Sequence, residues 1–227
     1  MIVISDITKT YVTASSTVNA LDEANATIEE REFVLIVGRS GSGKSTLLSV
    51  LGGLTRPSKG KVELNGRDIW KMDDAELSKV RSREIGFVFQ FAGLLPTLNT
   101  LENVMLPAMF SDNKKDVAKR AEELLVSLGL GDKLASYPHQ LSGGELKRAA
   151  IARALLNDPS IILADEPTGD LDADTEMEIM ELFREINKKG KTVIMVTHNP
   201  DLSTYASRVF RMAKGKLNIE TGPLACE

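Results

Sequence analysis

The sequence predicts an α/β fold with a mainly parallel sheet, an N-terminal antiparallel β part and an inserted helical subdomain. Three observations lead to this fold class. Short apolar runs typical of buried strands occur before residue 90 and again after residue 160. A glycine-rich loop separates one of these runs from a helical pattern. Between about residues 91 and 159 the pattern is helical, with no convincing strand.

Residues 1 to about 37 are expected to form short strands. Residues 2–4, 26–28 and 33–37 predict three of them, and the last is apolar throughout. Residues 44–54 continue with the apolar spacing of a helix. Residues 61–64 alternate like a half-exposed strand, and the Asn-Gly pair that follows them is a strong hairpin signal.

A further apolar strand over residues 85–89 ends at Gln90, where the helical part begins. In that part, residues 113–128 form an amphipathic helix bounded by Gly129. Strand patterns then return at residues 161–164, 192–197 and 208–212. The simplest organisation is one domain, with a core over about residues 1–90 and 160–227 and a helical subdomain over about 91–159.

Composition limits the classes of function. Hydrophobic residues make up 42% and charged residues 26% of the 227 residues, which is ordinary for a globular protein. The formal net charge of −4 gives no overall basic surface, so no nucleic-acid partner is expected. The single cysteine, Cys226, excludes a disulfide within the chain, as is usual in a reducing compartment.

Membrane insertion by this chain itself is not expected. No apolar run approaches the roughly 20 residues that a membrane span requires. Residues 1–6 lack the basic start and long apolar stretch of a secretion signal. We therefore expect a cytoplasmic protein.

A phosphate-binding loop follows the apolar strand at residues 33–37. Its sequence matches G-x-x-x-x-G-K-[ST] in the strand–loop–helix context that the motif requires. Glycines let backbone N–H groups surround phosphate oxygens, Lys44 adds a charge for the β- and γ-phosphates, and the Ser45 hydroxyl is a ligand for Mg²⁺. The loop consists of Gly38, Arg39, Ser40, Gly41, Ser42, Gly43, Lys44, Ser45 and Thr46.

Two carboxylates, Asp165 and Glu166, end the apolar run that starts at residue 161. Both are expected at the carboxyl edge of a parallel sheet, beside the phosphate loop. Asp165 is predicted to hold Mg²⁺ through water, and Glu166 to orient or deprotonate the water that attacks the γ-phosphate. The alternative, two solvated acids at the start of a loop, is weakened by the phosphate loop upstream.

The segment Ser142-Gly143-Gly144-Glu145 allows two interpretations that are compatible with each other. It fits S-x-x-E, the capping box that starts a helix. A capped helix start with two glycines also offers unobstructed backbone donors to an anion. Because a cap does not require two consecutive glycines, each of which lowers helix stability, the pair favours contact with phosphate.

Six polar positions occur in an order typical of one family. They are Lys44, Gln90, Ser142, Asp165, Glu166 and His198. This order resembles that of the ATP-binding subunits of ABC transporters, and the resemblance covers nearly the whole chain. It implies a P-loop NTPase core that binds ATP and Mg²⁺, hydrolyses ATP and forms an ATP-dependent homodimer.

The resemblance implies that each ATP site is shared between two copies of the chain. Ser142, Gly143 and Gly144 would contact the γ-phosphate bound by the opposite subunit. Asp172 would lie in the loop at the dimer interface. Two sites would then form only in a head-to-tail dimer.

The resemblance also assigns roles around the reacting phosphate. Gln90 would contact Mg²⁺ and the attacking water, and would link the core to the helical subdomain. His198 would contact the γ-phosphate, and together with Lys44, Gln90 and Glu166 would form the catalytic group. Tyr11 would stack on adenine. By themselves, His198 would be a capping or surface histidine and Tyr11 an ordinary half-buried aromatic.

Two positions depart from the family pattern. The last signature position, usually Gln, is Glu145. Its carboxylate would repel a γ-phosphate unless it caps its own helix or pairs with Lys147 or Arg148. We interpret Glu145 as a cap in a site that remains active. The Gly that usually precedes the strand entering the phosphate loop is missing from residues 30–32.

The stretch from Phe91 to Leu98 is unusually apolar for a segment that follows Gln90. Packing between the two lobes is one explanation. The other is docking of an integral membrane permease, since exposed apolar patches mark interfaces. We expect docking to a permease to hold the chain at the cytoplasmic face of the cell membrane.

Finer resemblance points to one group of ABC ATPases. Residues 85–90, 101–104 with 106–107, and 164–169 look like the lipoprotein-release, macrolide-efflux and antimicrobial-peptide-resistance group. This implies export or mechanical transmission across the membrane. The transported substrate, the direction beyond this resemblance and the identity of the permease are not encoded in this chain.

Two rival functions explain less of the sequence. A soluble ABC ATPase of DNA repair needs long inserted coiled coils, and one of translation usually carries two such domains in one chain; neither feature is found. A small-molecule kinase with a phosphate loop leaves Ser142, Gly143, Gly144 and His198 unexplained, and would use ATP as a monomer.

Overall fold

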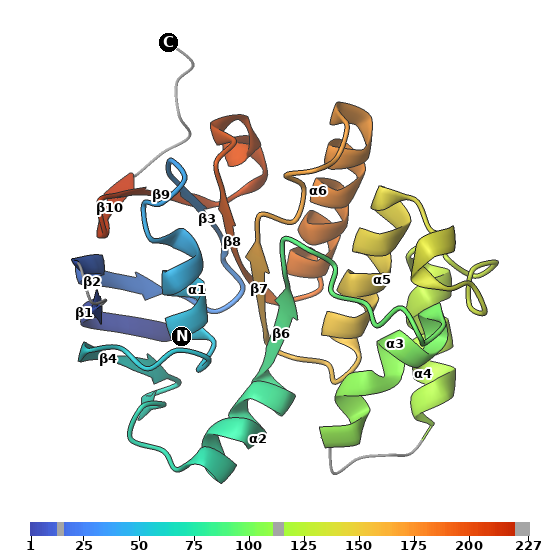
Figure 1. The fold of residues 1–227 in the computed structure, drawn as a ribbon, viewed down its shortest axis with the longest axis horizontal. Coiled ribbons are helices and arrows are strands. Elements are labelled where there is room, and N and C mark those ends of the chain that lie inside the picture. Colours follow the sequence, from blue (N-terminus) through green and yellow to red (C-terminus); the bar gives the residue numbers. More distant parts are fainter. Residues whose placement is uncertain (13–15, 111–115, 221–227) are drawn as a thin grey trace.

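The computed structural model describes residues 1–12, 16–110 and 116–220 (Figure 1). Within these ranges the strands form a four-stranded sheet of order β2-β1-β4-β5 and a six-stranded sheet of order β10-β9-β3-β8-β7-β6. Helix α1 (Lys44–Leu51) lies between the two sheets, and α5 and α6 lie on the other side of the six-stranded sheet (Figure 1). The predicted α/β class is confirmed, including its N-terminal antiparallel part.

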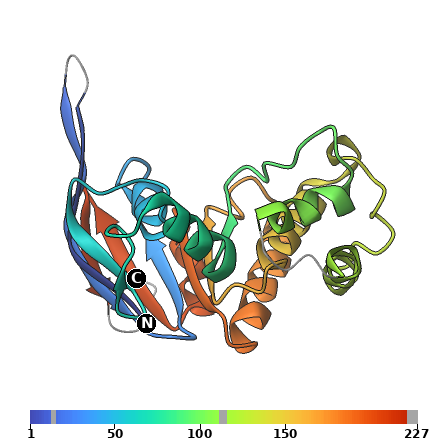
Figure 2. The same cartoon turned by 90° about the horizontal axis from the view of Figure 1, so that it is seen from below.

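The antiparallel sheet is longer than the sequence patterns predict. Strands β1 (Ile2–Val12) and β2 (Thr17–Ile28) continue well beyond the predicted residues, and Ile2 pairs with Ile28. Irregular register along β1 breaks the apolar alternation, which is why the pattern is visible only at one end of each strand. Figure 2 shows this hairpin extending beyond the rest of the molecule.

The Asn-Gly turn is confirmed. Strand β4 (Lys59–Leu64) pairs with the short β5 (Arg67–Asp68) across Asn65 and Gly66. Both turn residues have positive φ, 50° and 76°, as a two-residue hairpin turn of this type requires.

The six-stranded sheet carries the strands that lead to the predicted site. They are β3 (Phe33–Val37), β6 (Ile85–Val88), β7 (Ile161–Asp165), β8 (Thr192–Thr197) and β9 (Arg208–Ala213), all parallel, with β10 (Lys216–Glu220) antiparallel at the edge. Strand β6 ends one residue earlier than predicted, and Phe89 is exposed.

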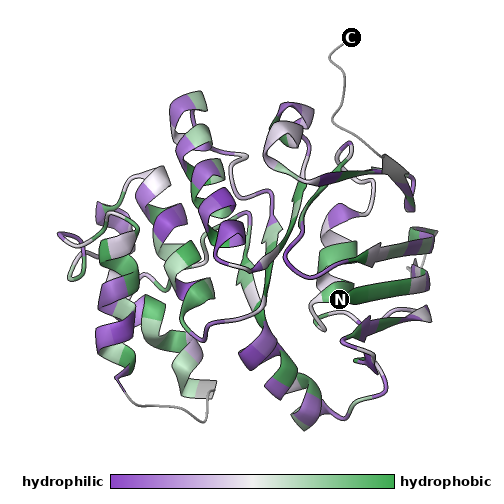
Figure 3. Cartoon of the chain, turned by 180° about the vertical axis from the view of Figure 1, so that it is seen from behind, coloured by the Kyte–Doolittle hydropathy of each residue, from purple (hydrophilic) through white to green (hydrophobic). Residues whose placement is uncertain are grey.

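Both faces of this sheet are buried. Val34 and Ile36 of β3 join the core shared with α1 and the antiparallel sheet, whereas Phe33, Leu35 and Val37 join the core beneath α5 and α6. A strand that is buried on both faces reads as a continuous apolar run, as observed. In Figure 3 the central strands are mostly apolar, and α6 alternates between polar and apolar residues.

The helices differ more from prediction than the strands. Those described are α2 (Asp74–Glu84), α3 (Thr100–Met105), α4 (Val117–Ser127), α5 (Gly143–Leu155) and α6 (Ala173–Lys188), with 3-10 turns η1 (Leu106–Phe110), η2 (Pro138–Gln140) and η3 (Pro200–Tyr205). Helix α4 begins at Val117 rather than at residue 113; residues 113–115 lie outside the described ranges, as does Cys226. The division into a core and a helical subdomain stays a prediction.

The missing glycine before β3 has a visible consequence. Arg31 adopts φ 64°, in the left-handed region that favours glycine. The turn is held in place because Thr192 Oγ1 accepts a bond from the Arg31 N–H at 2.9 Å, and Asn187 Nδ2 donates to the Arg31 carbonyl at 2.8 Å. The turn therefore keeps its shape without the glycine.

Candidate active site

The phosphate loop connects β3 to α1 and is packed against two other strands. A Cβ at Gly38 would lie 2.4 Å from the Met212 carbonyl oxygen, and one at Gly43 would lie 2.2 Å from that of Ala20. Gly43 also has φ 108°. The loop therefore requires glycine at both positions to fit beside β9 and β2, in addition to leaving room for phosphate.

Lys44 closes this loop from inside. Its side chain is 4% exposed, and its ammonium donates to the carbonyl oxygens of Gly38 at 2.8 Å and Arg39 at 3.3 Å. The same ammonium lies 3.3 Å from Glu166 Oε1. Lys44 thus lies between the phosphate loop and the acidic residues at the end of β7, where a γ-phosphate would need a positive charge.

Ser45 and Asp165 meet directly, as the strand order predicts. The Ser45 hydroxyl donates to Asp165 Oδ1 at 3.0 Å, although 120 residues separate them in the chain. Burial, the largest effect, together with the neighbouring charge of Glu166, raises the pKa of Asp165 above its usual range, against the Ser45 bond and Lys44. A hydroxyl and a carboxylate oxygen side by side are a donor set that suits Mg²⁺.

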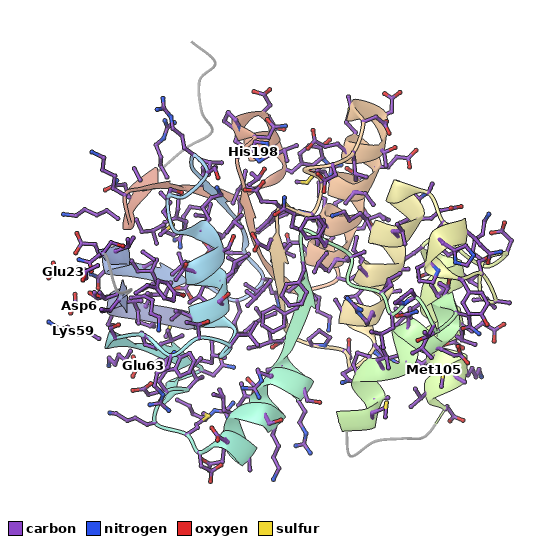
Figure 4. All side chains as sticks on the ribbon, viewed as in Figure 1. Asp6, Glu23, Lys59, Glu63, Met105 and His198 are labelled. Carbon is purple, nitrogen blue, oxygen red and sulfur yellow. The ribbon has the colours of Figure 1, made fainter. Side chains whose placement is uncertain are left out.

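Glu166 binds both of its catalytic neighbours at once. Its Oε1 faces Lys44, and its Oε2 lies 2.5 Å from His198 Nδ1. Glu166 has φ 42°, and its N–H donates to the Val196 carbonyl at 2.9 Å, which fixes the turn after β7 beside the end of β8. Figure 4 shows His198 at that end of β8. The carboxyl ends of parallel strands thus bring these groups together.

The start of α5 is a capping box, as predicted. Ser142 N–H donates to Glu145 Oε2 at 2.7 Å, and Glu145 N–H donates to Ser142 Oγ at 3.3 Å. Glu145 also lies 3.5 Å from Lys133, a partner that the sequence did not suggest. Lys147 and Arg148 are engaged elsewhere, with the Gln90 carbonyl and with Glu178. The capping interpretation of Glu145 is confirmed.

The two glycines of this segment do not have the same explanation. A Cβ at Gly144 would lie 2.7 Å from Thr175 Cγ2, so helix packing alone requires glycine there. A Cβ at Gly143 would meet only Leu171 Cδ2, at 3.3 Å, and Gly143 is exposed. The argument that surplus glycine favours phosphate contact therefore holds for Gly143 alone.

Three further predicted site residues come from other elements of the fold. Tyr11, 44% exposed, is near the end of β1, where the Lys9 ammonium lies 5.1 Å from its ring centre. Gln90 follows β6 and is half-buried. Asp172 caps α6, accepting from Thr175 N–H at 3.0 Å and from its hydroxyl at 2.7 Å. Their roles toward nucleotide stay predictions.

Glu145→Gln is expected to leave ATP hydrolysis within tenfold of the parent and to lower the free energy of unfolding by less than about 1 kcal/mol at pH 7. Gln still accepts from Ser142 but loses the charge beside Lys133. The backbone bond from Ser142 lowers the pKa of Glu145, so its contribution is present above the ordinary Glu pKa and is lost as pH falls through the lowered value.

The measurement is urea unfolding of Glu145→Gln and the parent at pH 7 and at about pH 4, with ATPase assays at pH 7. The stability difference should shrink at the lower pH. A tenfold rise in turnover for the variant would show that the carboxylate opposes phosphate, against the capping interpretation.

Asp165→Asn is expected to stabilise the nucleotide-free protein at pH 7 by up to about 1 kcal/mol and to abolish hydrolysis. The folded state raises the pKa of Asp165, so the stability cost of its ionisation builds up as the pH rises from the ordinary Asp pKa to the raised value and is complete above it. The gain is limited because Asp165 is partly exposed. Melting temperatures of both proteins, without Mg²⁺ or nucleotide, should converge below the ordinary Asp pKa. A variant less stable than the parent at pH 7 would contradict this reading of Asp165.

Comparisons with known proteins agree with this geometry. The family model described as ABC transporter matches residues 21–169, more than half of the chain. The chain belongs to the ABC transporter family. It is 49% identical over 93% of its length to an ABC transporter ATP-binding protein of Thermotoga maritima described as uncharacterized, covering 91% of that protein.

Two further relatives carry more specific names. The chain is 44% identical to the lipoprotein-releasing system ATP-binding protein LolD of Geobacter metallireducens, covering 94% of this chain and 96% of the relative. It is 46% identical to the macrolide export ATP-binding/permease protein MacB of Chlorobaculum tepidum, over 95% of this chain but 33% of that longer protein.

A solved structure shows the same fold. It is a dimeric ATP-binding cassette in a post-hydrolysis state with ADP and Pi, with a TM-score of 0.90, 41% identity and coverage of 100% of both chains. The predicted P-loop NTPase core and ATPase activity are thereby confirmed for this ABC-family chain. Among the described residues, no helix has the length and apolar character needed to cross a membrane.

Proposed function

We propose that this chain is the ATP-hydrolysing subunit of an ABC transporter of the export or mechanical-transmission type, which closes as a head-to-tail homodimer around two Mg-ATP and drives a separate membrane permease. The observation that carries the coupling to a permease is an exposed apolar surface beside Gln90. The nucleotide chemistry rests on the cluster of Lys44, Ser45, Asp165 and Glu166 described above.

ATP binds at the phosphate loop, with Lys44 on its terminal phosphates and Tyr11 against adenine. Ser45 and Asp165, with Gln90, hold Mg²⁺, which when bound neutralises charge on the phosphates. Glu166 orients and deprotonates the attacking water, and His198 contacts the γ-phosphate. In the structure the Glu166 carboxylate contacts Lys44 and His198. Binding of ATP would draw Lys44 toward phosphate and leave Glu166 to face water.

The homodimer supplies the missing contact to the γ-phosphate. Ser142 and Gly143 are exposed at the start of α5, and the glycine leaves backbone donors accessible. Asp172 lies in the exposed loop before α6, whose start packs against Gly144. Relatives of this fold are dimeric in solved structures. A second copy bringing Ser142 to the phosphate loop would complete each site.

The permease is proposed to dock beside Gln90. A groove of about 660 Å³ lies between α2, β6 and α5 and is lined by the stacked rings of Phe87 and Phe89. Phe91 next to it is 76% exposed, and Leu95 is also exposed. Packing between the lobes does not explain Phe89, Phe91 and Leu95, because packing would bury side chains that are exposed here. An apolar helix of a permease would cover them. The subunit would then sit peripherally at the cytoplasmic membrane face.

The test uses tagged Glu166→Gln, expressed in the native cell with ATP kept present while membranes are solubilised. An integral membrane permease should copurify, and Phe91→Glu in the same background should lose it while still forming the ATP-dependent dimer. Val126→Glu is the matched control, because Val126 is 57% exposed, lies on α4 and does not line the groove. A permease captured equally by Phe91→Glu would place docking elsewhere. Recovery of only soluble partners would reject the transport function.

A further inference from the structure

Helix α5 carries two cations that hold the backbone of the segment after Gln90. Lys147 donates to the Gln90 carbonyl. Arg153 donates to the Ala92 carbonyl at 2.6 Å and to the Gly93 carbonyl at 2.7 Å. Three carbonyls within four residues are thus bound by one helix. Neither side chain was singled out from the sequence as part of this link.

Lys147 is the less expected of the two. It is 5% exposed, although lysine is almost never fully buried without a charged partner. Burial lowers its pKa, with Asp170 acting in the opposite direction. Its hydrogen bond is to a neutral carbonyl rather than to a carboxylate. Because the desolvation of a buried ammonium offsets much of what its hydrogen bond contributes, this bond adds little net stability.

The position of Lys147 connects two parts of the proposed sites. It lies five residues after Ser142 on the same helix, a rise of roughly 7.5 Å at about 1.5 Å per residue. Ser142 is expected to meet the nucleotide of the partner copy, and Gln90 the nucleotide of its own chain. Lys147 therefore joins, within one chain, the residue that contacts one ATP to the residue that contacts the other.

We propose that Lys147 is a positioning residue for ATP hydrolysis. It fixes the Gln90 backbone to α5. When Ser142 engages the nucleotide bound by the partner copy, this link places Gln90 at the nucleotide bound by its own chain. The inference rests on the proposed head-to-tail dimer. Arg153 extends the same link to Ala92 and Gly93, and Asn103 organises the next turns by binding the carbonyls of Leu95 and Leu98 at 3.1 and 2.9 Å. The segment from Gln90 to Leu98 therefore moves with the helical elements that hold it.

The test is Lys147→Met, which keeps the apolar stem and removes the donor. We expect kcat to fall at least tenfold, the ATP concentration for half-maximal rate to stay within threefold, and the melting temperature to stay equal or rise. A purely structural lysine would give the opposite pattern, with lower stability and an unchanged kcat. Lys119→Met, at an exposed lysine of α4, is the matched control and should match the parent throughout.

A second variant covers the case in which Lys147→Met folds poorly. Lys147→Arg keeps a cationic donor and should retain kcat within threefold of the parent. A folded Lys147→Arg that loses as much kcat as the Met variant, or a folded Lys147→Met with parental kcat, would overturn the proposal. Dimerisation of both variants is compared in the Glu166→Gln background by sizing with ATP, and kcat is measured with Glu166 intact. If Glu166→Gln alone forms no dimer, the proposed function fails first. A normal dimer together with a parental kcat for Lys147→Met rejects only the role of Lys147.

Discussion

Glu166→Gln is expected to slow ATP hydrolysis by about 10²–10⁴-fold while ATP still binds, and to convert the chain from monomer to dimer when ATP is added. The amide keeps the size of the side chain but cannot take the proton of the attacking water. It also lacks the charge that now faces Lys44 at 3.3 Å and His198 at 2.5 Å. Removing that charge frees Lys44 for phosphate, so binding should not weaken.

The measurement is steady-state turnover together with size-exclusion chromatography with and without ATP. Glu185→Gln is a matched control, since Glu185 is an exposed acid on α6 whose ion pair, among the described residues, is with Lys188 of the same helix. It should match the parent in both assays. A Glu166→Gln protein that binds ATP tightly yet stays monomeric would count against the composite site.

Lys44→Ala is expected to weaken ATP binding by about 10–100-fold and to remove detectable hydrolysis at ordinary ATP concentrations. The ammonium is the only positive side chain that the described contacts place against Glu166 and the loop carbonyls together. Without it the γ-phosphate would meet the acids Asp165 and Glu166 without the positive charge of the Lys44 ammonium. The loop would also lose its two internal hydrogen bonds from Lys44.

Calorimetric titration with a non-hydrolysable ATP analogue gives the affinity of Lys44→Ala, and urea unfolding gives its stability without nucleotide. Lys119→Ala again serves as control for loss of a lysine. Parental affinity in a well-folded Lys44→Ala protein would show that the phosphate site lies elsewhere. If Lys44→Ala loses affinity because it is unfolded, the titration would be repeated with Lys44→Met, which preserves the apolar stem of the side chain.

Much of the site could be predicted because it depends on order along the chain. A parallel sheet places the ends of β3, β7 and β8 at one edge, so the residues that follow each strand meet there. Ser45 with Asp165, and Glu166 with His198, are contacts of this kind. The apolar strands and the polar residues that follow them can both be recognised in the sequence. Because the strands are parallel, those polar residues meet at the same edge of the sheet.

What could not be predicted depends on packing between helices. Lys147 and Arg153 lie in an alanine-rich helix where their side chains would ordinarily be expected to reach solvent, and nothing local indicates that both point to the segment after Gln90. The requirement for Gly144 likewise comes from Thr175 on another helix. Helix α2 was missed because only Leu77 and Val80 are buried along its polar length.

The central claim is that each ATP site is built from two copies of the chain, and a mixing experiment tests it most directly. Lys44→Ala removes the ammonium that the phosphate loop needs to bind ATP. Gly143→Asp spoils the signature segment, since a carboxylate would face the γ-phosphate, while an acid in the first turn of α5 leaves the Ser142 cap intact. Each variant alone should be inactive. An equal mixture should regain turnover that both components lack, up to about a quarter of the parental value, because half of the dimers are mixed and each holds one intact site. A mixture no more active than its components would contradict sites shared between subunits.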